Sequence, residues 1–133
     1  MHRLLIVEDD PATRAEAAEV AAEEGLLSRA ALRFEIEQAL EHWRPDLVLL
    51  DIVMPEVEGM EVLRLLAGAG AAVPVVLLSA FRDYLEIAQR LAGASDVLIA
   101  DILQKPYQRE RLRQALRAAM TARLAPRPTV APN

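Results

Sequence analysis

The sequence predicts an α/β fold in which a parallel β-sheet is covered by helices on both faces. Apolar runs near residues 4–7, 47–50 and 73–78 are continuous rather than alternating, which is typical of strands buried on both sides. Segments with helical spacing separate these runs, and such alternation implies right-handed βαβ units. The chain has 133 residues, of which 53% are hydrophobic, so one domain with a full core is expected.

The first half of the chain begins with the run at 4–7 and continues into a helix. Residues 12–24 are rich in Ala and Glu, Pro11 suits a first helical turn, and Gly25 is a stop signal. Residues 26–31 are a weaker strand candidate. A second helix, closed by Pro45, is marked by apolar residues at helical spacing: Phe34, Ile36 and Leu40.

The second half repeats the alternation of strands and helices. Helices are expected over residues 57–67 and 84–92, and a fifth strand over 98–103. The Pro-rich residues 123–133 predict a disordered or extended tail, or the start of a linker, after a domain spanning 1–122. A last helix is marked by the i, i+3, i+4, i+7 spacing of Leu112, Ala115, Leu116 and Ala119.

Composition argues against several classes of protein. A net charge of −5 disfavours a general nucleic-acid binder, so we expect no direct nucleic-acid binding by this domain. The chain has no cysteine, which excludes disulfides and thiolate metal sites. No apolar run approaches the ~20 residues that span a bilayer, and no signal peptide is evident. A cytoplasmic location without membrane association follows as the expectation.

Polar side chains follow the apolar runs at the points where strands are expected to end. Glu8 and Asp9 follow the first, Asp51 the third, Ser79 the fourth and Lys105 the fifth. In a flavodoxin-like strand order, 2-1-3-4-5, the first and third strands are neighbours at the switch point where ligands bind. Clustered carboxylates there require a cation, and their hard oxygen atoms suit Mg²⁺.

Phosphoryl transfer is the chemistry that these residue types fit together. An Asp carboxylate can be the nucleophile and form an aspartyl phosphate. Mg²⁺, the Ser79 hydroxyl and the Lys105 ammonium would each take one oxygen of the transferring group. Taken singly, Asp51 also suits a helix cap or turn, Ser79 an ordinary strand-end hydroxyl and Lys105 a solvated surface charge.

In combination, these motifs resemble the receiver domain of bacterial two-component response regulators, over roughly residues 2–122. The matching segments are residues 4–14, 51–55 with Gly59, 77–80 and 105–107. In such receivers a sensor histidine kinase or phosphotransfer protein donates a phosphoryl group to the Asp that ends the third strand. The resemblance implies a signalling module that is not an enzyme in the usual sense, because receivers turn over no free substrate of their own.

The resemblance also assigns roles to residues. Asp51 corresponds to the phospho-acceptor, Ser79 to the switch hydroxyl and Lys105 to the family's lysine. Asp10 falls outside the acidic pair, because Arg14 stands five residues after Asp9 as in the family. The resemblance also implies homodimerisation through the fourth helix, fifth strand and fifth helix. The implied Mg²⁺ ligands are Glu8, acting mostly through water, Asp9, Asp51 and the backbone carbonyl of Val53.

The chain departs from the family pattern in two places. The segment 95–104, before the lysine, is several residues longer than in typical receivers, on the face used for dimerisation and output. Ile102 stands where the family often has Tyr or Phe, and an aliphatic side chain cannot switch by ring rotation. At positions 53 and 81, Val and Phe offer no polar group to orient water, which predicts slow loss of the phosphoryl group.

Two other readings compete with a phospho-acceptor. A phosphorylation-independent interaction domain on the same fold is suggested by Ile102 and the insertion. An aspartate-nucleophile phosphatase is less well supported, because position 53 is Val rather than a second Asp. Basic residues in and after the last helix indicate either a solvated face or a surface for an acidic partner: Arg109, Arg111, Arg113, Arg117 and Arg123.

Overall fold

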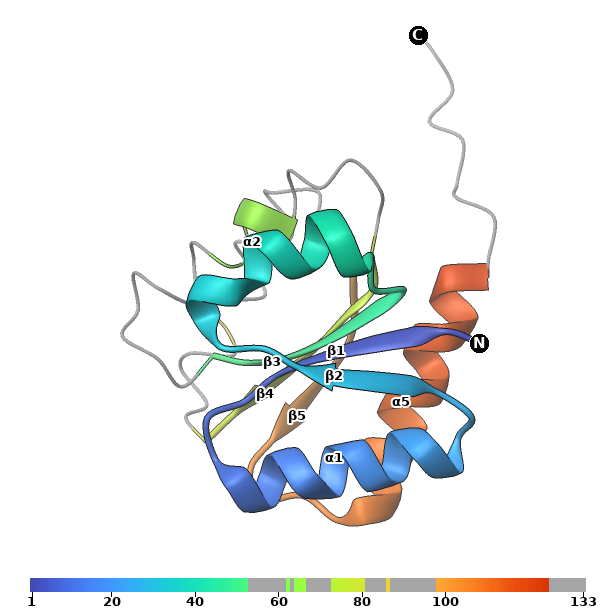
Figure 1. Ribbon diagram of the computed structural model, residues 1–133. Coiled ribbons are helices and arrows are strands. Elements are labelled where there is room, and N and C mark those ends of the chain that lie inside the picture. The colour runs from blue at the N-terminus through green and yellow to red at the C-terminus, as the bar shows by residue number, and fades with distance from the viewer. Residues whose placement is uncertain (53–61, 63, 67–72, 81–85, 87–97, 125–133) are drawn as a thin grey trace, which may run out of the picture.

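The computed structural model describes residues 1–52, 62, 64–66, 73–80, 86 and 98–124. Its centre is a five-stranded parallel sheet in the order β2-β1-β3-β4-β5 (Figure 1), which confirms the predicted flavodoxin-like topology. The strands are β1 (Arg3–Val7), β2 (Leu27–Ala30), β3 (Leu47–Asp51), β4 (Val75–Ser79) and β5 (Ile99–Gln104).

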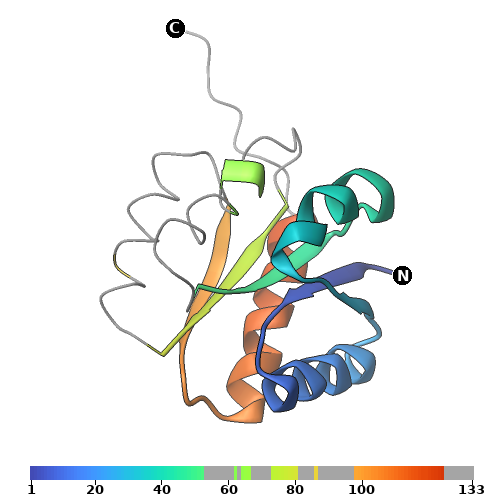
Figure 2. The same ribbon diagram turned by 60° about the vertical axis from the view of Figure 1, so that its left-hand side comes forward.

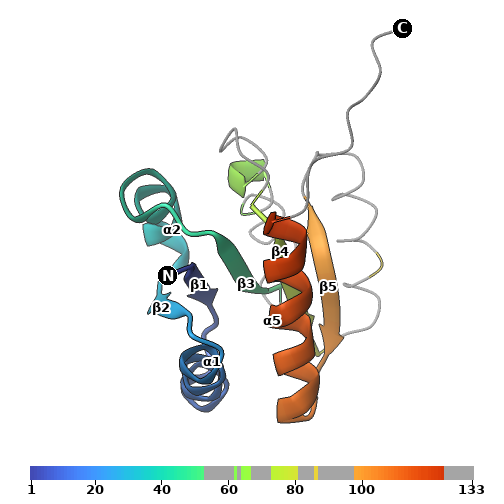
Figure 3. The same ribbon diagram turned by 90° about the vertical axis from the view of Figure 1, so that its right-hand side faces the viewer.

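Helices cover both faces of the sheet. α1 (Pro11–Glu23) and α5 (Arg109–Leu124) lie on one face, and Figure 3 shows α1 nearly end-on with α5 beside β4 and β5. On the opposite face lies α2 (Ile36–Gln38), as Figure 1 and Figure 2 show. A 3-10 turn, Arg33–Glu35, precedes α2, and a π-helix, Ala39–Trp43, continues it. None of the described helices is long and apolar enough to cross a membrane.

The continuous apolar runs are explained by burial on both faces of the sheet. Successive residues of β1 alternate between two cores: Leu4 and Ile6 pack toward α1 and α5, whereas Leu5 and Val7 pack toward α2. All residues of β3 and β4 are buried, so neither strand has a polar face that would produce alternation. Val20, Leu112 and Leu116 complete the first core, and Ile36, Val62 and Leu66 the second.

Local signals account for the ends of α1. The Asp10 carboxylate accepts hydrogen bonds from the Thr13 backbone N–H and hydroxyl, at 2.9 and 2.6 Å, and so caps the first turn. Pro11 takes the first helical position, as the sequence predicts. Gly25 follows the last turn with a φ of 76°, a left-handed conformation that glycine adopts without steric cost.

Several predicted segments fall partly or wholly outside the described residues. Of the helix expected over 57–67, residues 62 and 64–66 are described and are helical. Of the helix expected over 84–92, residue 86 is described and is helical. α5 continues past the expected domain boundary at 122, to Leu124, and the tail 125–133 lies outside the described part of the chain.

Candidate functional site

Four of the predicted site residues lie at the carboxyl edge of the sheet. Glu8 directly follows β1, Asp51 and Ser79 are the last residues of β3 and β4, and Lys105 directly follows β5. The parallel register aligns Asp51 with Leu78, and the backbone N–H of Lys105 donates to the Ser79 carbonyl at 2.8 Å. These hydrogen bonds fix the strand ends relative to one another, so the side chains that follow them share one edge.

The Lys105 ammonium joins two carboxylates at this edge. Its Nζ lies 2.8 Å from Glu8 Oε2 and 2.9 Å from Asp51 Oδ2. The carboxylates are almost fully buried, with side-chain exposures of 1% for Glu8 and 7% for Asp51, against 19% for Lys105. Buried charges of opposite sign compensate one another, so the three groups form an ion-paired cluster at the end of the sheet.

Burial and the charges in this cluster shift the pKa of Glu8 and of Lys105. Burial raises the pKa of the Glu8 carboxyl and the neighbouring Asp51 raises it further, which outweighs the hydrogen bonds from Lys105 and the Asp10 N–H. Burial lowers the pKa of the Lys105 ammonium, but its hydrogen bonds to Glu8 and Asp51 outweigh burial, so the net shift is upward. Lys105 therefore stays protonated and holds a permanent positive charge beside Asp51.

Glu8, Asp9 and Asp10 are consecutive but have different surroundings. Glu8 is buried, and its Oε1 accepts the Asp10 backbone N–H at 2.9 Å. Asp9 is exposed beside it, and Asp10 is used as the cap of α1. Hydrogen bonds from the Thr13 hydroxyl and backbone N–H lower the pKa of Asp10, and the charges of Lys105 and Arg14 add to this. Two of the three acids are therefore available to the strand-end site.

The donor atoms at this edge fit Mg²⁺ by their chemistry. Carboxylate oxygens from Glu8, Asp9 and Asp51 are hard ligands of the kind that Mg²⁺ prefers. Within the described residues no three acidic or histidine side chains are already arranged around one point, and the Lys105 ammonium stands between Glu8 and Asp51. Val53, the expected backbone ligand, lies outside the described residues, as does Phe81.

β5 contains an irregularity that the sequence did not reveal. Val75 pairs with Ile99 and Val76 with Asp101, so Ala100 is an extra residue, a β-bulge. The Asp101 side chain accepts the Ile102 N–H at 2.8 Å and binds both terminal nitrogens of Arg111 at 2.7 Å. Ile102 is half-buried against the core on the α2 side. Residues 99–104 of the long segment thus form the bulged strand β5, which the Asp101–Arg111 pair holds to α5.

The basic residues of α5 pair with acids of the same chain. Arg109, Arg113 and Arg117 form ion pairs with glutamates on and just after α1. Arg123 lies 3.6 Å from Asp46, the residue before β3. The sequence reading missed this network, although acids at helical spacing would have signalled it: Glu19, Glu23 and Glu24. The acids that Arg109, Arg113 and Arg117 meet therefore lie on α1 and at its C-terminal end.

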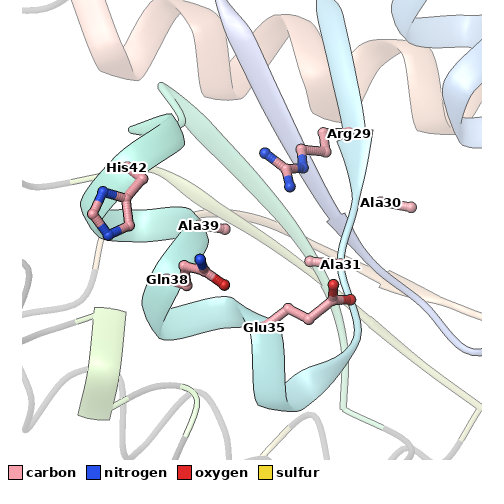
Figure 4. Close-up of a pocket in the computed structure, with 7 residues that line it drawn as sticks. All are labelled: Arg29, Ala30, Ala31, Glu35, Gln38, Ala39 and His42. Carbon is pink, nitrogen blue, oxygen red and sulfur yellow. The ribbon is translucent and has the colours of Figure 1, made fainter.

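A separate pocket lies away from the strand-end cluster. It opens between the end of β2, at Arg29, and the helical segment that carries Gln38 and His42 (Figure 4). None of the predicted site residues lines it. The cis peptide bond between Lys105 and Pro106 follows β5, which is the edge strand on the other side of the sheet from β2. The strand ends, rather than this pocket, carry the residues suited to chemistry.

The fold and the strand-end cluster define a flavodoxin-like α/β domain of the kind that carries its site at the carboxyl edge. Residues 4–117 match the family model of the response regulator receiver domain. The chain belongs to this family, whose members are the receiver modules of two-component systems.

Relatives and solved structures agree with this assignment. Response regulator MprA of Mycobacterium tuberculosis (strain ATCC 25618 / H37Rv) is 34% identical over 119 residues, which cover 89% of this chain and 50% of MprA. DNA-binding response regulator MtrA of Mycolicibacterium smegmatis is 34% identical over 121 residues, with the same coverages. The chain therefore spans half the length of these curated relatives.

Structural similarity extends over nearly the whole chain. NtrX from Brucella abortus superposes with a TM-score of 0.76 at 27% identity, covering 93% of this chain and 28% of NtrX. The chemotaxis protein CheY4 of Vibrio cholerae superposes with a TM-score of 0.75 at 20% identity, covering 90% of this chain and 98% of CheY4. At 20% identity, the similarity to CheY4 shows a shared fold alone.

Proposed function

We propose that this receiver domain accepts a phosphoryl group on Asp51, from a sensor histidine kinase or a phosphotransfer protein, in a Mg²⁺-dependent reaction. The observation that carries the proposal is the contact of Lys105 Nζ with both Glu8 and Asp51. Lys105 is 97 positions from Glu8 and 54 from Asp51 in the sequence, and the sheet brings the three side chains together. A lysine that served only as a solvated surface charge would not require two buried carboxylate partners. A buried carboxylate held beside a fixed cation at a solvent-facing sheet edge suits a nucleophile for phosphoryl transfer.

In the proposed reaction an Asp51 carboxylate oxygen attacks phosphorus. The new P–O bond forms as the P–N bond to the donor histidine breaks, and the electron pair of that bond leaves with the imidazole. The Lys105 ammonium and the Ser79 hydroxyl would each stabilise one phosphoryl oxygen. Mg²⁺, when bound, supplies a second positive charge to the phosphoryl group, and Glu8, Asp9, Asp51 and the carbonyl of Val53 are its proposed ligands.

Intact-mass analysis after incubation with acetyl phosphate and Mg²⁺ tests this proposal. We expect one phosphoryl adduct in the wild type, none in Asp51→Ala and none after chelation of the metal. Asp101→Asn is the matched control, since it removes a carboxylate from β5 outside the site and should leave the adduct. Absence of an adduct both with acetyl phosphate and with phosphoramidate, together with no measurable Mg²⁺ binding, would contradict the proposal.

The altered β5 supports a second candidate, a phosphorylation-independent interaction domain on the same fold. The bulge at Ala100 and the half-buried Ile102 change the strand through which receivers couple phosphorylation to output. This candidate predicts that partner binding is the same for the wild type and Asp51→Ala. Retention of the ion-paired Glu8, Asp51 and Lys105 favours the phospho-acceptor.

Further features belong to the same proposal. The domain acts through protein contacts in the cytoplasm, without membrane association or direct nucleic-acid binding, and forms homodimers through the fourth helix, β5 and α5. Val53 and Phe81 offer no polar group to orient an attacking water, so we expect the aspartyl phosphate to be long-lived. A half-life of seconds in kinase-free protein would contradict that expectation.

A further inference from the structure

Arg14 reaches back from the first turn of α1 to the end of β1. Its Nη1 donates a hydrogen bond to the main-chain oxygen of Glu8 at 3.4 Å. Helical side chains tilt toward the N-terminus of their helix, so the start of α1 aims this guanidinium at the carboxyl edge of the sheet. The guanidinium therefore lies beside the segment that carries Glu8, Asp9 and Asp10.

The helix dipole gives no reason for a cation at position 14. The N-terminus of a helix carries partial positive charge, which favours acids over cations nearby. α1 begins at Pro11 with Asp10 as its cap, and Arg14 is its fourth residue, directly after the first turn. The contact of Arg14 with the end of β1, rather than the stability of the helix, therefore gives this guanidinium its surroundings.

Arg14 also differs from the arginines of α5. Each of Arg109, Arg113 and Arg117 is paired with a glutamate, whereas no carboxylate of the described residues lies within ion-pair distance of Arg14. Its charge is therefore not neutralised by direct contact with any described acid. Among the described residues, the acids near this edge are Glu8, Asp9, Asp10 and Asp51, and the ammonium of Lys105 pairs with Glu8 and Asp51.

This excess of negative charge affects any phosphoryl donor, because donors are anions. A cluster of one sign of charge repels ligands of that sign and slows their encounter with the site. We propose that Arg14 is a specificity-determining residue, whose guanidinium offsets the acidic charge at the rim and favours the approach of dianionic phosphoryl donors to Asp51. This inference rests on the proposed function and adds a named residue to it.

Donors of different charge test the inference. Initial rates of adduct formation are measured by intact mass near neutral pH with acetyl phosphate, a dianion, and phosphoramidate, which carries less net negative charge. Arg14→Gln should lower the rate with acetyl phosphate about tenfold at low salt, lower the phosphoramidate rate less, and lose its effect at high salt. Arg14→Lys should keep most of the wild-type rate because it keeps the charge.

Arg29→Gln is the matched control, because it removes the same charge from an exposed position on β2. It should behave as the wild type with both donors. A Mg²⁺ titration by calorimetry gives a readout independent of phosphorylation. Arg14→Gln should bind Mg²⁺ about threefold more tightly at low salt, because a repelling cation is removed.

The outcomes of these measurements separate the interpretations. Equal loss of rate with both donors at every salt concentration, or weaker Mg²⁺ binding by Arg14→Gln, would mean that Arg14 only holds the Glu8 main chain, and would overturn the inference. Rates for Arg14→Gln equal to those of Arg29→Gln would also overturn it. No adduct in the wild type with either donor would reject the proposed function. An adduct in the wild type, together with an equal effect of Arg14→Gln on the rates with both donors, would reject this inference alone.

Discussion

Lys105 and Asp51, 54 positions apart in the chain, meet with Nζ 2.9 Å from Oδ2, and the same ammonium also holds Glu8. One cation thus compensates two buried carboxylates at the edge of the sheet. The stability of this edge and its readiness for an anionic ligand consequently depend on the same side chain.

Replacing that side chain should destabilise the domain. Lys105→Met leaves the Glu8 carboxylate buried without its salt-bridge partner, which should lower the free energy of unfolding by about 3 kcal/mol. Mg²⁺ should then raise the free energy of unfolding of the variant more than that of the wild type, because a cation again stands among the acids. Urea unfolding with and without Mg²⁺ measures both effects. Arg29→Met is the control, and equal stability of Lys105→Met and the wild type would contradict the ion-paired cluster.

Asp10 should contribute to stability and not to phosphoryl transfer. Asp10→Ala removes the cap of α1 and should lower the free energy of unfolding by about 1 kcal/mol. Asp10→Asn keeps a capping oxygen and should restore most of the loss. Denaturant unfolding measures both variants, and the adduct with acetyl phosphate should persist in each. Loss of the adduct in Asp10→Asn would instead place Asp10 among the metal ligands.

The Asp101–Arg111 pair should make stability depend on pH. The hydrogen bonds from Arg111 hold the pKa of Asp101 below its usual value. A carboxyl whose pKa is lowered by folding stabilises the protein above its unfolded pKa, and that contribution is lost as pH falls through the folded pKa. The free energy of unfolding of Asp101→Asn should therefore lie below that of the wild type at pH 7, and this difference should shrink as the pH falls through the lowered pKa of Asp101.

The control for this measurement is Glu37→Gln, which changes an exposed carboxylate next to the start of α2. It should show no comparable change of the gap with pH. A gap between Asp101→Asn and the wild type that stays constant between neutral and acidic pH would show that the Arg111 pair does not stabilise the folded state.

The arginine–glutamate network between α1 and α5 should be sensitive to salt. Glu24 pairs with Arg113 and Arg117, whose hydrogen bonds lower its pKa. The Arg117 side chain is 61% exposed, so its pair with Glu24 is screened by salt, whereas Glu24 and Arg113 are mostly buried. Glu24→Gln should therefore lower the urea midpoint at low salt and lower it less at about 1 M salt. A salt-independent loss would indicate that Glu24 acts through packing rather than charge.

The sheet could be predicted because its strands carry a strong local signal. The runs in β1, β3 and β4 are apolar throughout, since both faces of each strand are buried. β2, an edge strand with exposed Leu27 and Arg29, gave a weaker signal, because one side of it has no neighbour in the described sheet. The positions of Glu8, Asp51, Ser79 and Lys105 at one edge followed from topology alone.

Features that depend on distances between elements could not be predicted. The bulge at Ala100 arises from the register between β4 and β5, which no local pattern records. The pairing of Arg111 with Asp101 requires α5 to lie over β5, and the α1–α5 network requires the two helices to lie side by side. The left-handed conformation of Arg44, after the π-helix, likewise has no signal in residue type.

The cluster at the strand ends has a consequence for the chain during its synthesis. Glu8 emerges from the ribosome early, whereas Lys105, which compensates it, emerges 97 residues later and is followed by α5. A nascent chain that ends before Lys105 has the acidic residues but not the cation that pairs with them. The complete cluster, and with it the proposed competence for phosphoryl transfer, therefore exists only after β5 and Lys105 have been added.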